Sequence, residues 1–381
     1  MTTAIPFNRP SLLGSELDNI RIAHANGALS GDGAFSHYCE KWLAEHTGAA
    51  RALVTHSCTG ALEMAAILID LKPGDEVIMP SYTFVSTANA VVLRGATPVF
   101  VDIRPDTMNL DEKLIEAAIT PKTRAIFVVH YAGVACEMDA INEIAQRRGL
   151  EVVEDAAQGL GSSYRGRPLG GLGGLAAFSF HETKNITCGE GGALIINDKK
   201  FVDAAEVIHQ KGTDRRRFIR GLVDKYTWRA AGSSFLLGEM AAAFLAAQLD
   251  HADEITAARL AIWRRYHEAL AGFEASGWIK RPTIPAECEH NAHMYYVLLD
   301  RRFDRDEVIS ALRAEGVYAV FHYVPLHSSE AGLRYGRAHG ELRHTDDCSA
   351  RLLRLPFWTD MLAKDQETVI DAFSRVLRSF A

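Results

Sequence analysis

One lysine that is expected to be shielded from solvent is the first residue in this chain that suggests catalytic chemistry. Lys184 follows the short apolar run 178–180 and leads into the glycine-rich segment 189–192. Burial and a nearby cation lower the pKa of a lysine, which is what Schiff-base chemistry requires. A single lysine is usually only a surface charge, so the interpretation rests on two motifs that precede it.

The first of these motifs is the apolar segment 152–155, which ends in two acids. An aspartate at the carboxyl end of a strand can keep a pyridinium nitrogen protonated, so that the ring accepts electrons. Side chains alternate along a strand, so Asp155 points the same way as Val153, and Glu154 points the other way. Asp155 is therefore the candidate if Val153 faces the interior. A solvated acidic loop is the alternative.

The second motif is Ser57-Cys58-Thr59-Gly60, which lies between an expected strand and an expected helix. Small side chains open the helix, so backbone N–H groups and the Thr59 hydroxyl can face a phosphate at its positive end. An ordinary Ser or Thr N-cap would produce the same pattern.

Short apolar strands and amphipathic helices alternate through the segment that carries these motifs. The periodicity predicts strands over 52–55, 76–79, 97–101, 125–130 and 151–154, and helices over 59–71, 86–94, 111–118 and 138–148. This alternation implies a mainly parallel sheet with ligands at the carboxyl ends of its strands.

The second half of the chain is expected to begin with a loop or hairpin over 161–174 and a helix over 235–249, continued toward residue 270. Strands over 294–299 and 319–321 and helices over 306–315 and 366–378 should follow. We expect a large domain over residues 1–250 and a smaller C-terminal α/β domain over 251–381.

Composition excludes several classes of protein. The 381 residues carry a formal net charge of −7, which argues against a nucleic-acid binder.

The six cysteines form no CxxC pair, and the histidine pairs His290/His293 and His322/His327 lack further ligands, so we expect no disulfide framework and no metal site. No signal peptide and no apolar run of about 20 residues is present, which predicts a cytoplasmic protein outside the membrane. The sequence contains no strand–GxGxxG–helix order, so it gives no indication of a nicotinamide enzyme.

Several motifs in order carry a resemblance to one family. The segments SCTGALEMAA, PSYTFVSTANA, VFVDI, VVEDAAQ, FSFHETKN and GEGGALI closely resemble the DegT/DnrJ/EryC1/StrS family of pyridoxal-phosphate (PLP) dependent sugar aminotransferases. The resemblance includes FHYVPLH near the C-terminus and spans nearly the whole chain. It implies the aspartate-aminotransferase-like α/β fold (fold type I), with a large domain built on a mainly parallel mixed sheet.

The resemblance also implies roles for individual residues. Lys184 would carry the cofactor as a Schiff base and move a proton between carbons, while Asp155 would pair with the ring nitrogen. Further contacts would come from Gln158, Phe84 and His181 near the ring and from Cys58, Thr59 and Ser179 at the phosphate. Core packing is the alternative for Phe84, and a packed neutral histidine for His181.

A homodimer or a dimer of dimers with shared active sites is a further implication. The family's partner segment resembles YNYR and offers an Asn to the phosphate, whereas this chain reads Tyr226-Thr227-Trp228-Arg229. The contact is therefore either lost or made by the shorter hydroxyl of Thr227.

Sugar-nucleotide contacts are also expected. The basic segment 211–220 could receive a diphosphate through Arg215 and Arg220, or be a solvated arm. His322 and Tyr323 would line the sugar pocket.

The most similar members, judged from PFNRP and IMPSYTFVSTANAVVLRGATPVFVDIRPDTMN, act at C4 of a keto-sugar. The resemblance implies that dTDP-4-dehydro-6-deoxy-D-glucose and L-glutamate give dTDP-4-amino-4,6-dideoxy-D-galactose and 2-oxoglutarate, for a surface polysaccharide of the enterobacterial common antigen type. Amination at C3 and a PLP-dependent sugar dehydratase are the alternatives. Related dehydratases have histidine at the position of the anchoring lysine, so Lys184 favours a transaminase.

Overall fold

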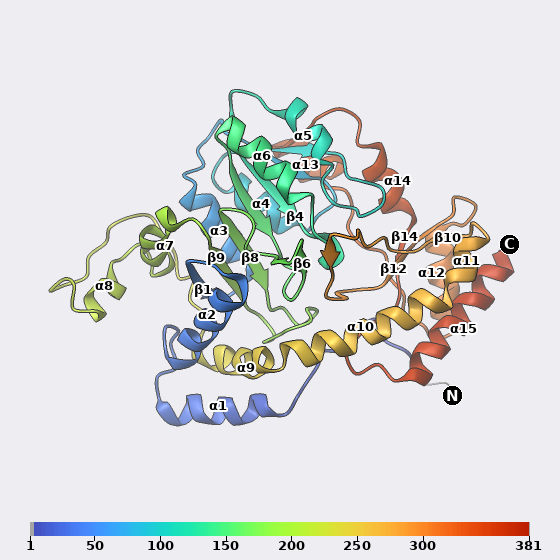
Figure 1. Ribbon diagram of the computed structural model, residues 1–381, viewed down its shortest axis with the longest axis horizontal. Helices are drawn as coiled ribbons and strands as arrows, with labels where there is room; N and C mark the ends of the chain where they lie inside the picture. The colour runs from blue at the N-terminus through green and yellow to red at the C-terminus, as the bar shows by residue number, and fades with distance from the viewer. Residues whose placement is uncertain (1–3, 381) are drawn as a thin grey trace.

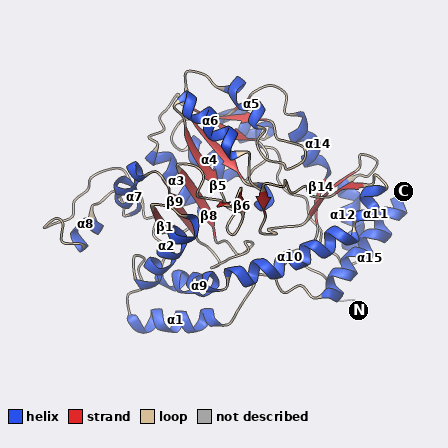
Figure 2. Ribbon diagram, viewed as in Figure 1, coloured by secondary structure: helices blue, strands red, loops and turns tan. Residues whose placement is uncertain are grey.

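An eight-stranded mixed sheet forms the centre of the computed structural model, which describes residues 4–380 (Figures 1 and 2). Its strand order is β1 (Arg51–Thr55), β9 (Gly192–Ile196), β8 (Leu175–Ser179), β5 (Glu151–Asp155), β4 (Thr123–Val129), β2 (Glu76–Pro80), β3 (Thr97–Val101) and β13 (Arg337–Ala338). Within this sheet β9 runs antiparallel to β8 and β1, and the other neighbouring pairs are parallel. The mainly parallel sheet that the sequence predicts is confirmed.

Helices cover both faces of this sheet, which is why its strands are nearly continuous apolar runs. One face packs against α3 (Cys58–Leu68), α4 (Val85–Val92) and α7 (Val202–His209). The other face packs against α5 (Glu112–Ala118), α6 (Met138–Arg148), α2 (Ala34–Thr47) and α9 (Glu239–Asp250). Successive residues of β5 divide between the two faces, because Val153 packs on the first face and Val152 on the other.

A second hydrophobic core belongs to the C-terminal part of the chain and contains Trp263, Tyr295 and Phe373. It lies between a three-stranded sheet and its helices, namely β10 (Ile279–Lys280), β12 (Tyr296–Leu299), β14 (Leu352–Arg354), α10 (Ala252–Ala269), α11 (Ala271–Ala275), α12 (Arg305–Ala314) and α15 (Ala363–Phe380). We propose a division at residue 250, where α9 ends. Two segments pack on the unit to which they do not belong by sequence. Ile5, near the N-terminus, pairs with Val317 of the second unit, and β13 of the second unit extends the large sheet.

The remaining elements lie around these two cores. A three-stranded sheet is formed by β11 (Cys288–Glu289), β6 (Ser163–Tyr164) and β7 (Arg167–Pro168), the last two within the expected loop or hairpin. Helix α1 (Ser15–Asn26) packs along α9 in Figure 1. The short elements are α8 (Arg215–Ile219), α13 (Glu330–Tyr335), α14 (Arg343–Arg351) and the 3-10 turns η1 (Tyr131–Gly133), η2 (Lys199–Phe201) and η3 (Leu326–Ser328). No helix within residues 4–380 has both the length and the apolar character to cross a bilayer.

Two predicted elements are wrong in their bounds. The helix expected from residue 235 begins at Glu239, because the Phe235 carbonyl accepts a hydrogen bond from the His56 N–H and Leu236 pairs with Thr55 on β1. The strand expected over 319–321 is reduced to one bridge between Val320 and Arg354. In both cases tertiary pairing overrides local sequence preference.

A glycine permits a close approach at the start of α3. A Cβ atom on Gly192 would lie 2.3 Å from the Cys58 nitrogen and 2.4 Å from the Ser57 carbonyl carbon. The backbone of β9 therefore packs directly against the first turn of α3, and a side chain at position 192 would separate them.

We predict that Gly192→Ala destabilises the protein by about 2–3 kcal/mol, because the methyl group meets backbone atoms that cannot rotate away. Urea unfolding would measure this loss of stability. Gly272→Ala in α11 is the matched control, since its Cβ meets nothing within 4 Å. Equal stability of the two variants would contradict the prediction.

Candidate active site

A cavity of about 590 Å³ lies where β5 and β8 end and α3 begins. Its walls come from both parts of the chain. The large unit contributes Cys58, Thr59, Asp155, Gln158, Ser179 and Lys184, and the second unit contributes His293, His322, Tyr323 and Arg354. Since carboxyl ends of parallel strands gather at one sheet edge, residues distant in sequence meet here.

Asp155 is a buried carboxyl group on this wall. Its Oδ2 accepts a hydrogen bond from the Thr87 hydroxyl at 2.6 Å, and its Oδ1 accepts one from the Ala157 N–H at 3.2 Å. Burial raises the pKa of Asp155 above its ordinary value. No arginine, lysine or histidine of the described chain forms an ion pair with it, so the carboxylate lacks a cation at bonding distance.

Glu154 points to the other face of β5 and has a different role. It accepts hydrogen bonds from the N–H groups of Gly170, Leu172 and Gly173 at 2.6–2.8 Å, and His130 Nε2 lies 2.9 Å away. These contacts fold the glycine-rich segment back onto the sheet. Strand alternation thus separates a carboxylate in the cavity from one that holds a loop, and neither is solvated.

Lys184 lines the same cavity in the loop between β8 and β9. Its pKa is lowered from the ordinary 10.5, chiefly because burial penalises the ammonium form, while the carboxylate of Asp155 acts in the opposite direction. A larger share of neutral amine, the nucleophilic form, follows from this shift.

The start of α3 presents polar groups to the cavity. Ser57 caps the helix by accepting a hydrogen bond from the Gly60 N–H at 3.0 Å, and the Thr59 hydroxyl lies 2.7 Å from that of Ser86. Burial raises the pKa of Cys58 well above its ordinary value, so its side chain stays a neutral thiol. Hydroxyls and free N–H groups at a helix N-terminus can bind a phosphate.

Comparison with known proteins identifies the family. The model of the DegT/DnrJ/EryC1/StrS aminotransferase family matches residues 11–374. The chain belongs to this family. It is therefore a PLP-dependent sugar aminotransferase.

Solved structures agree with this assignment. The aminotransferase TlmJ from Streptoalloteichus hindustanus is 31% identical with a TM-score of 0.91, over 99% of this chain and 100% of that one. DesV from S. venezuelae, solved in complex with a ketimine intermediate, is 33% identical with a TM-score of 0.89, over 99% of each chain. The PLP form of the putative sugar aminotransferase Spr1654 from Streptococcus pneumoniae is 25% identical with a TM-score of 0.91, over 99% of this chain and 100% of that one.

The cavity of this aminotransferase fits the cofactor. PLP needs an amine for its aldehyde, an anion for its ring nitrogen and donors for its phosphate. Lys184, Asp155 and the first turn of α3 offer these groups around one cavity. Within residues 4–380 the buried carboxyl group of Asp155 has no ion-pair partner at bonding distance, and a protonated ring nitrogen would supply one.

Four other expected cofactor residues line this cavity as well. Phe84, Ser179 and His181 are part of its wall, and Phe84 is 56% exposed, which disfavours core packing as its role. Both ends of the Gln158 amide already have protein partners: Oε1 accepts from the Ala132 N–H at 2.6 Å, and Nε2 donates to the Tyr323 hydroxyl at 2.8 Å. The His181 ring bonds the Thr183 hydroxyl at 2.9 Å.

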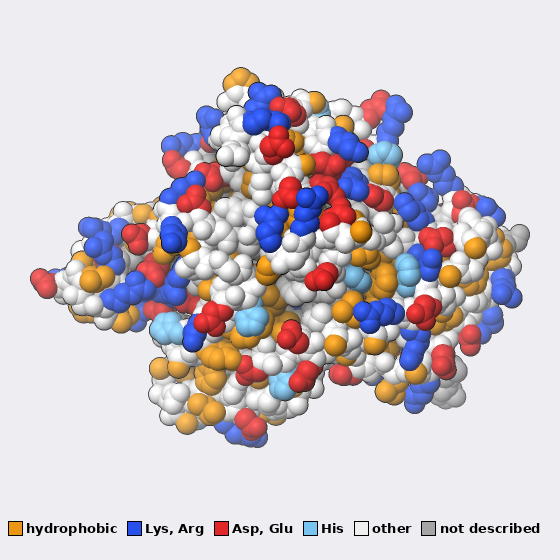
Figure 3. Space-filling model, viewed as in Figure 1, with side chains coloured by type: hydrophobic (Ala, Val, Ile, Leu, Met, Phe, Trp, Pro, Cys, Tyr) orange, Lys and Arg blue, Asp and Glu red, His pale blue; other side chains and the backbone are white. Residues whose placement is uncertain are grey.

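Three expected contact residues lie elsewhere, on the projection around α8 (Figure 1). The Thr227 N–H donates to Asp214, Arg215 donates to Gln210, and Arg220 forms a bidentate pair with Glu206. None of the three lines the cavity of its own chain. Lys and Arg side chains gather on this projection in Figure 3.

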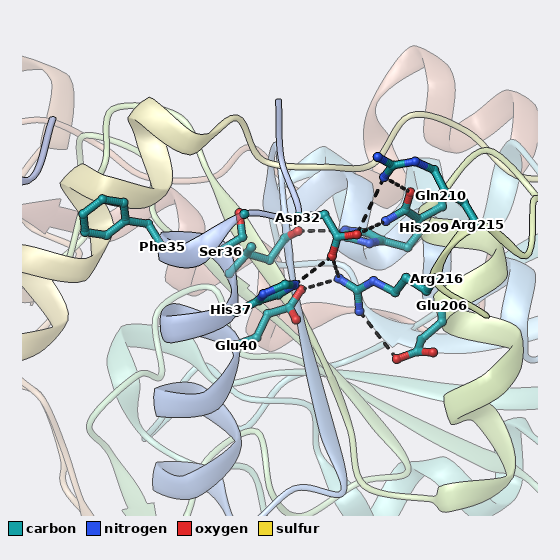
Figure 4. Close-up of polar contacts among 12 residues, drawn as sticks. Asp32, Phe35, Ser36, His37, Glu40, Glu206, His209, Gln210, Arg215 and Arg216 are labelled. Atoms are coloured by element: carbon teal, nitrogen blue, oxygen red, sulfur yellow. Dashed lines mark hydrogen bonds and ion pairs between the residues drawn. The ribbon is translucent and has the colours of Figure 1, made fainter. Parts of the chain in front are cut away.

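A buried ion cluster fixes the base of this arm, here defined as residues 211–230. Arg216 Nη2 lies 2.7 Å from Asp32 and 2.9 Å from Glu40, and Arg216 Nη1 lies 3.6 Å from Glu206 (Figure 4). Arg216 is 5% exposed, so these contacts are shielded from water. The arm is thereby attached to the loop before α2 and to α7.

The sequence interpretation missed several residues around the site, among them Thr87, Asn8, Tyr131 and Arg354. Thr87 lies one turn after Thr83, and that helical spacing beside Phe84 is the signal that could have revealed it. Asn8 lies in PFNRP, and Tyr131 follows a predicted strand. Arg354 ends the apolar strand β14, and nothing in its spacing marks it.

We predict that Lys184 in the cofactor-free protein titrates below 10.5, and that Asp155→Asn lowers its pKa further because the carboxylate favours the ammonium form. The pH dependence of covalent labelling by a neutral amine-directed reagent, read by mass spectrometry, measures both effects. Lys200 is the internal control, because its hydrogen bond with Glu151 raises its pKa. A midpoint for Lys184 at or above that of Lys200 would refute the prediction.

Proposed function

We propose that this aminotransferase converts dTDP-4-dehydro-6-deoxy-D-glucose and L-glutamate into dTDP-4-amino-4,6-dideoxy-D-galactose and 2-oxoglutarate. The observation that carries the proposal is the meeting of Lys184, Asp155 and the first turn of α3 in one cavity. The sugar and its C4 position are supported by the resemblance of PFNRP and the segment 78–109 to members that use this substrate. A surface polysaccharide of the enterobacterial common antigen type would be the destination of the product.

Bound PLP supplies an aldehyde that condenses with an amino group. It also supplies an electron-poor ring, which stabilises negative charge on a neighbouring carbon. The chain supplies binding and proton transfer. Lys184 Nζ, with its lowered pKa, would remove a proton from the α-carbon of the donor and return it at the other end of the exchange. Asp155 would hold the ring nitrogen protonated, and Thr87 would orient that carboxylate through its hydroxyl.

The phosphate of the cofactor would be held by Thr59, Ser179 and the backbone at Cys58, all in the cavity wall. Phe84 would cover one face of the ring. On the opposite wall, His322 and Tyr323 would contact the sugar, because they come from the second unit and face the same space as Lys184.

We predict that the wild-type protein, given PLP, L-glutamate and the keto-sugar nucleotide, forms an aminated sugar whose C4 axial amine NMR will identify. Lys184→Ala should lower turnover at least about a thousandfold, since the proton-transfer group is lost. Lys199→Ala, at an exposed lysine, is the matched control and should retain turnover. An equatorial amine or a C3 amine would redirect the substrate assignment, and release of ammonia without an amino-sugar would indicate a dehydratase.

The working unit would be a homodimer, or a dimer of dimers, in which each arm completes the site of the partner. Thr227, Arg215 and Arg220 lie on the arm and away from the cavity of their own chain. The arm also exposes large apolar side chains, with Trp228 81% and Leu222 63% accessible. Exposed apolar groups of this size commonly mark an interface.

Complementation between two inactive or impaired variants would test the shared site. One chain carries Lys184→Ala with an intact arm, and the other carries Arg215→Ala and Thr227→Ala with Lys184 intact. Unfolding and refolding them together at equal amounts should restore about a quarter of wild-type activity, because half of the dimers combine an intact arm with an intact lysine. No recovery, in dimers shown by sedimentation to be mixed, would place the arm's action within its own chain.

A further inference from the structure

A closed chain of contacts joins the two units at the cavity wall. The Ala132 N–H donates to Gln158 Oε1 at 2.6 Å, and Gln158 Nε2 donates to the Tyr323 hydroxyl at 2.8 Å. The Tyr323 ring stacks on His322, with centroids 3.7 Å apart, and the Tyr131 hydroxyl lies 2.7 Å from His322 Nδ1. Tyr131 and Ala132 are adjacent, so the circuit closes on itself.

Strained backbone holds the large-unit side of this circuit in place. Ala132 has φ of +56°, which residues with a Cβ rarely adopt, in the turn η1 that follows β4. Asn109 fixes the turn, because its Oδ1 accepts from the Tyr131 N–H at 2.9 Å. Backbone strain of this kind persists only where the surroundings enforce it, and it concentrates at functional sites.

The neighbours of His322 keep its ring neutral. Burial lowers the pKa of His322 well below its ordinary value, and Arg354, His293 and Lys184 add in the same direction. Burial raises the pKa of Tyr131 far above its ordinary value, so its hydroxyl remains protonated. A neutral imidazole has one nitrogen that donates and one that accepts, and the neighbour of the accepting nitrogen decides which is which.

Tyr131 is the neighbour that determines which nitrogen of His322 carries the hydrogen. Tyr82 is the other phenol next to it, with ring centroids 5.3 Å apart, but the Tyr82 hydroxyl has no hydrogen-bond partner among the described residues. We therefore assign His322 Nδ1, which lies 2.7 Å from the Tyr131 hydroxyl, as the acceptor of the Tyr131 proton. Because Nδ1 accepts this hydrogen bond, the hydrogen of the neutral ring is on Nε2. Within residues 4–380, Nε2 has no hydrogen-bond partner, and the His322 side chain lines the cavity.

We propose that Tyr131 is a positioning residue that fixes His322 as its Nε2–H form, which then donates a hydrogen bond to a hydroxyl or carbonyl oxygen of the acceptor sugar. The inference rests on the proposed function and deepens it. His322 and Lys184 line the same cavity, and the charge of Lys184 contributes to the lowered pKa of His322, so the part of the acceptor beside His322 would be the sugar ring that carries the reacting carbon.

The two half-reactions separate this role from a structural one. Each can be followed at the cofactor absorbance in single turnovers, with L-glutamate alone for the donor half and with keto-sugar nucleotide for the acceptor half. Tyr131→Phe should slow the acceptor half about tenfold, the effect of one mis-set hydrogen bond, and leave the donor half within about twofold. The donor has no ring oxygen to offer at this wall.

Tyr296→Phe is the matched control. Tyr296 packs against Tyr131 in the same aromatic cluster, with centroids 5.7 Å apart, and it makes no hydrogen bond to His322. Its removal should change neither half-reaction. Thermal unfolding of both variants checks that the cluster remains folded.

A double-mutant cycle tests the coupling directly. His322→Gln can place an amide N–H where Nε2–H lies, whereas the shorter His322→Asn cannot, so the acceptor half should be faster in the Gln variant. In the His322→Asn background, Tyr131→Phe should add less than about a twofold loss, because the ring that it positions is gone. Full additivity, or equal loss in both half-reactions, would overturn the inference while leaving the proposed function standing. A wild-type protein that aminates no keto-sugar nucleotide would overturn both.

Discussion

A carboxyl group held out of water with no cation of its own is the constraint on which the rest of this site depends. Asp155 is 5% exposed and takes hydrogen bonds from Thr87 and Ala157, yet no basic side chain of the described chain pairs with it. Leaving such a group charged is costly. A ligand that brings a positive nitrogen relieves this cost, and that makes the cavity selective for a cofactor such as PLP. The depressed pKa of Lys184 comes from the same dry surroundings.

The two units are joined at the site by polar contacts as well as by packing. Gln158 stands at the centre, because its amide spans from the strained turn after β4 to Tyr323 of the second unit. Buried amides whose groups are satisfied favour one arrangement of the surrounding structure. The cavity wall that would face the sugar is thus held in register with the wall that would face the cofactor.

The arm is ordered by a charge cluster of its own chain. Arg216 engages Asp32 and Glu40 at bonding distance while almost fully buried. Removing one member of such a cluster leaves uncompensated charge, so the cluster specifies one position for the arm strongly. In the proposed dimer, apolar side chains such as Trp228 would be presented to the partner by a preformed element, which would lower the entropic cost of association.

Sequence by itself determined the local facts: the strand and helix periodicity through residue 155, and the separation of Asp155 from Glu154 by alternation. These follow from the geometry of one strand or one helix turn. Tertiary structure decided which distant groups meet. Arg354 and Tyr131 belong to the site only because β14 and the turn after β4 are packed against it, and the helix expected at residue 235 starts late because Leu236 pairs with β1. Contacts between segments far apart in the chain depend on the whole packing, and local spacing carries no record of them.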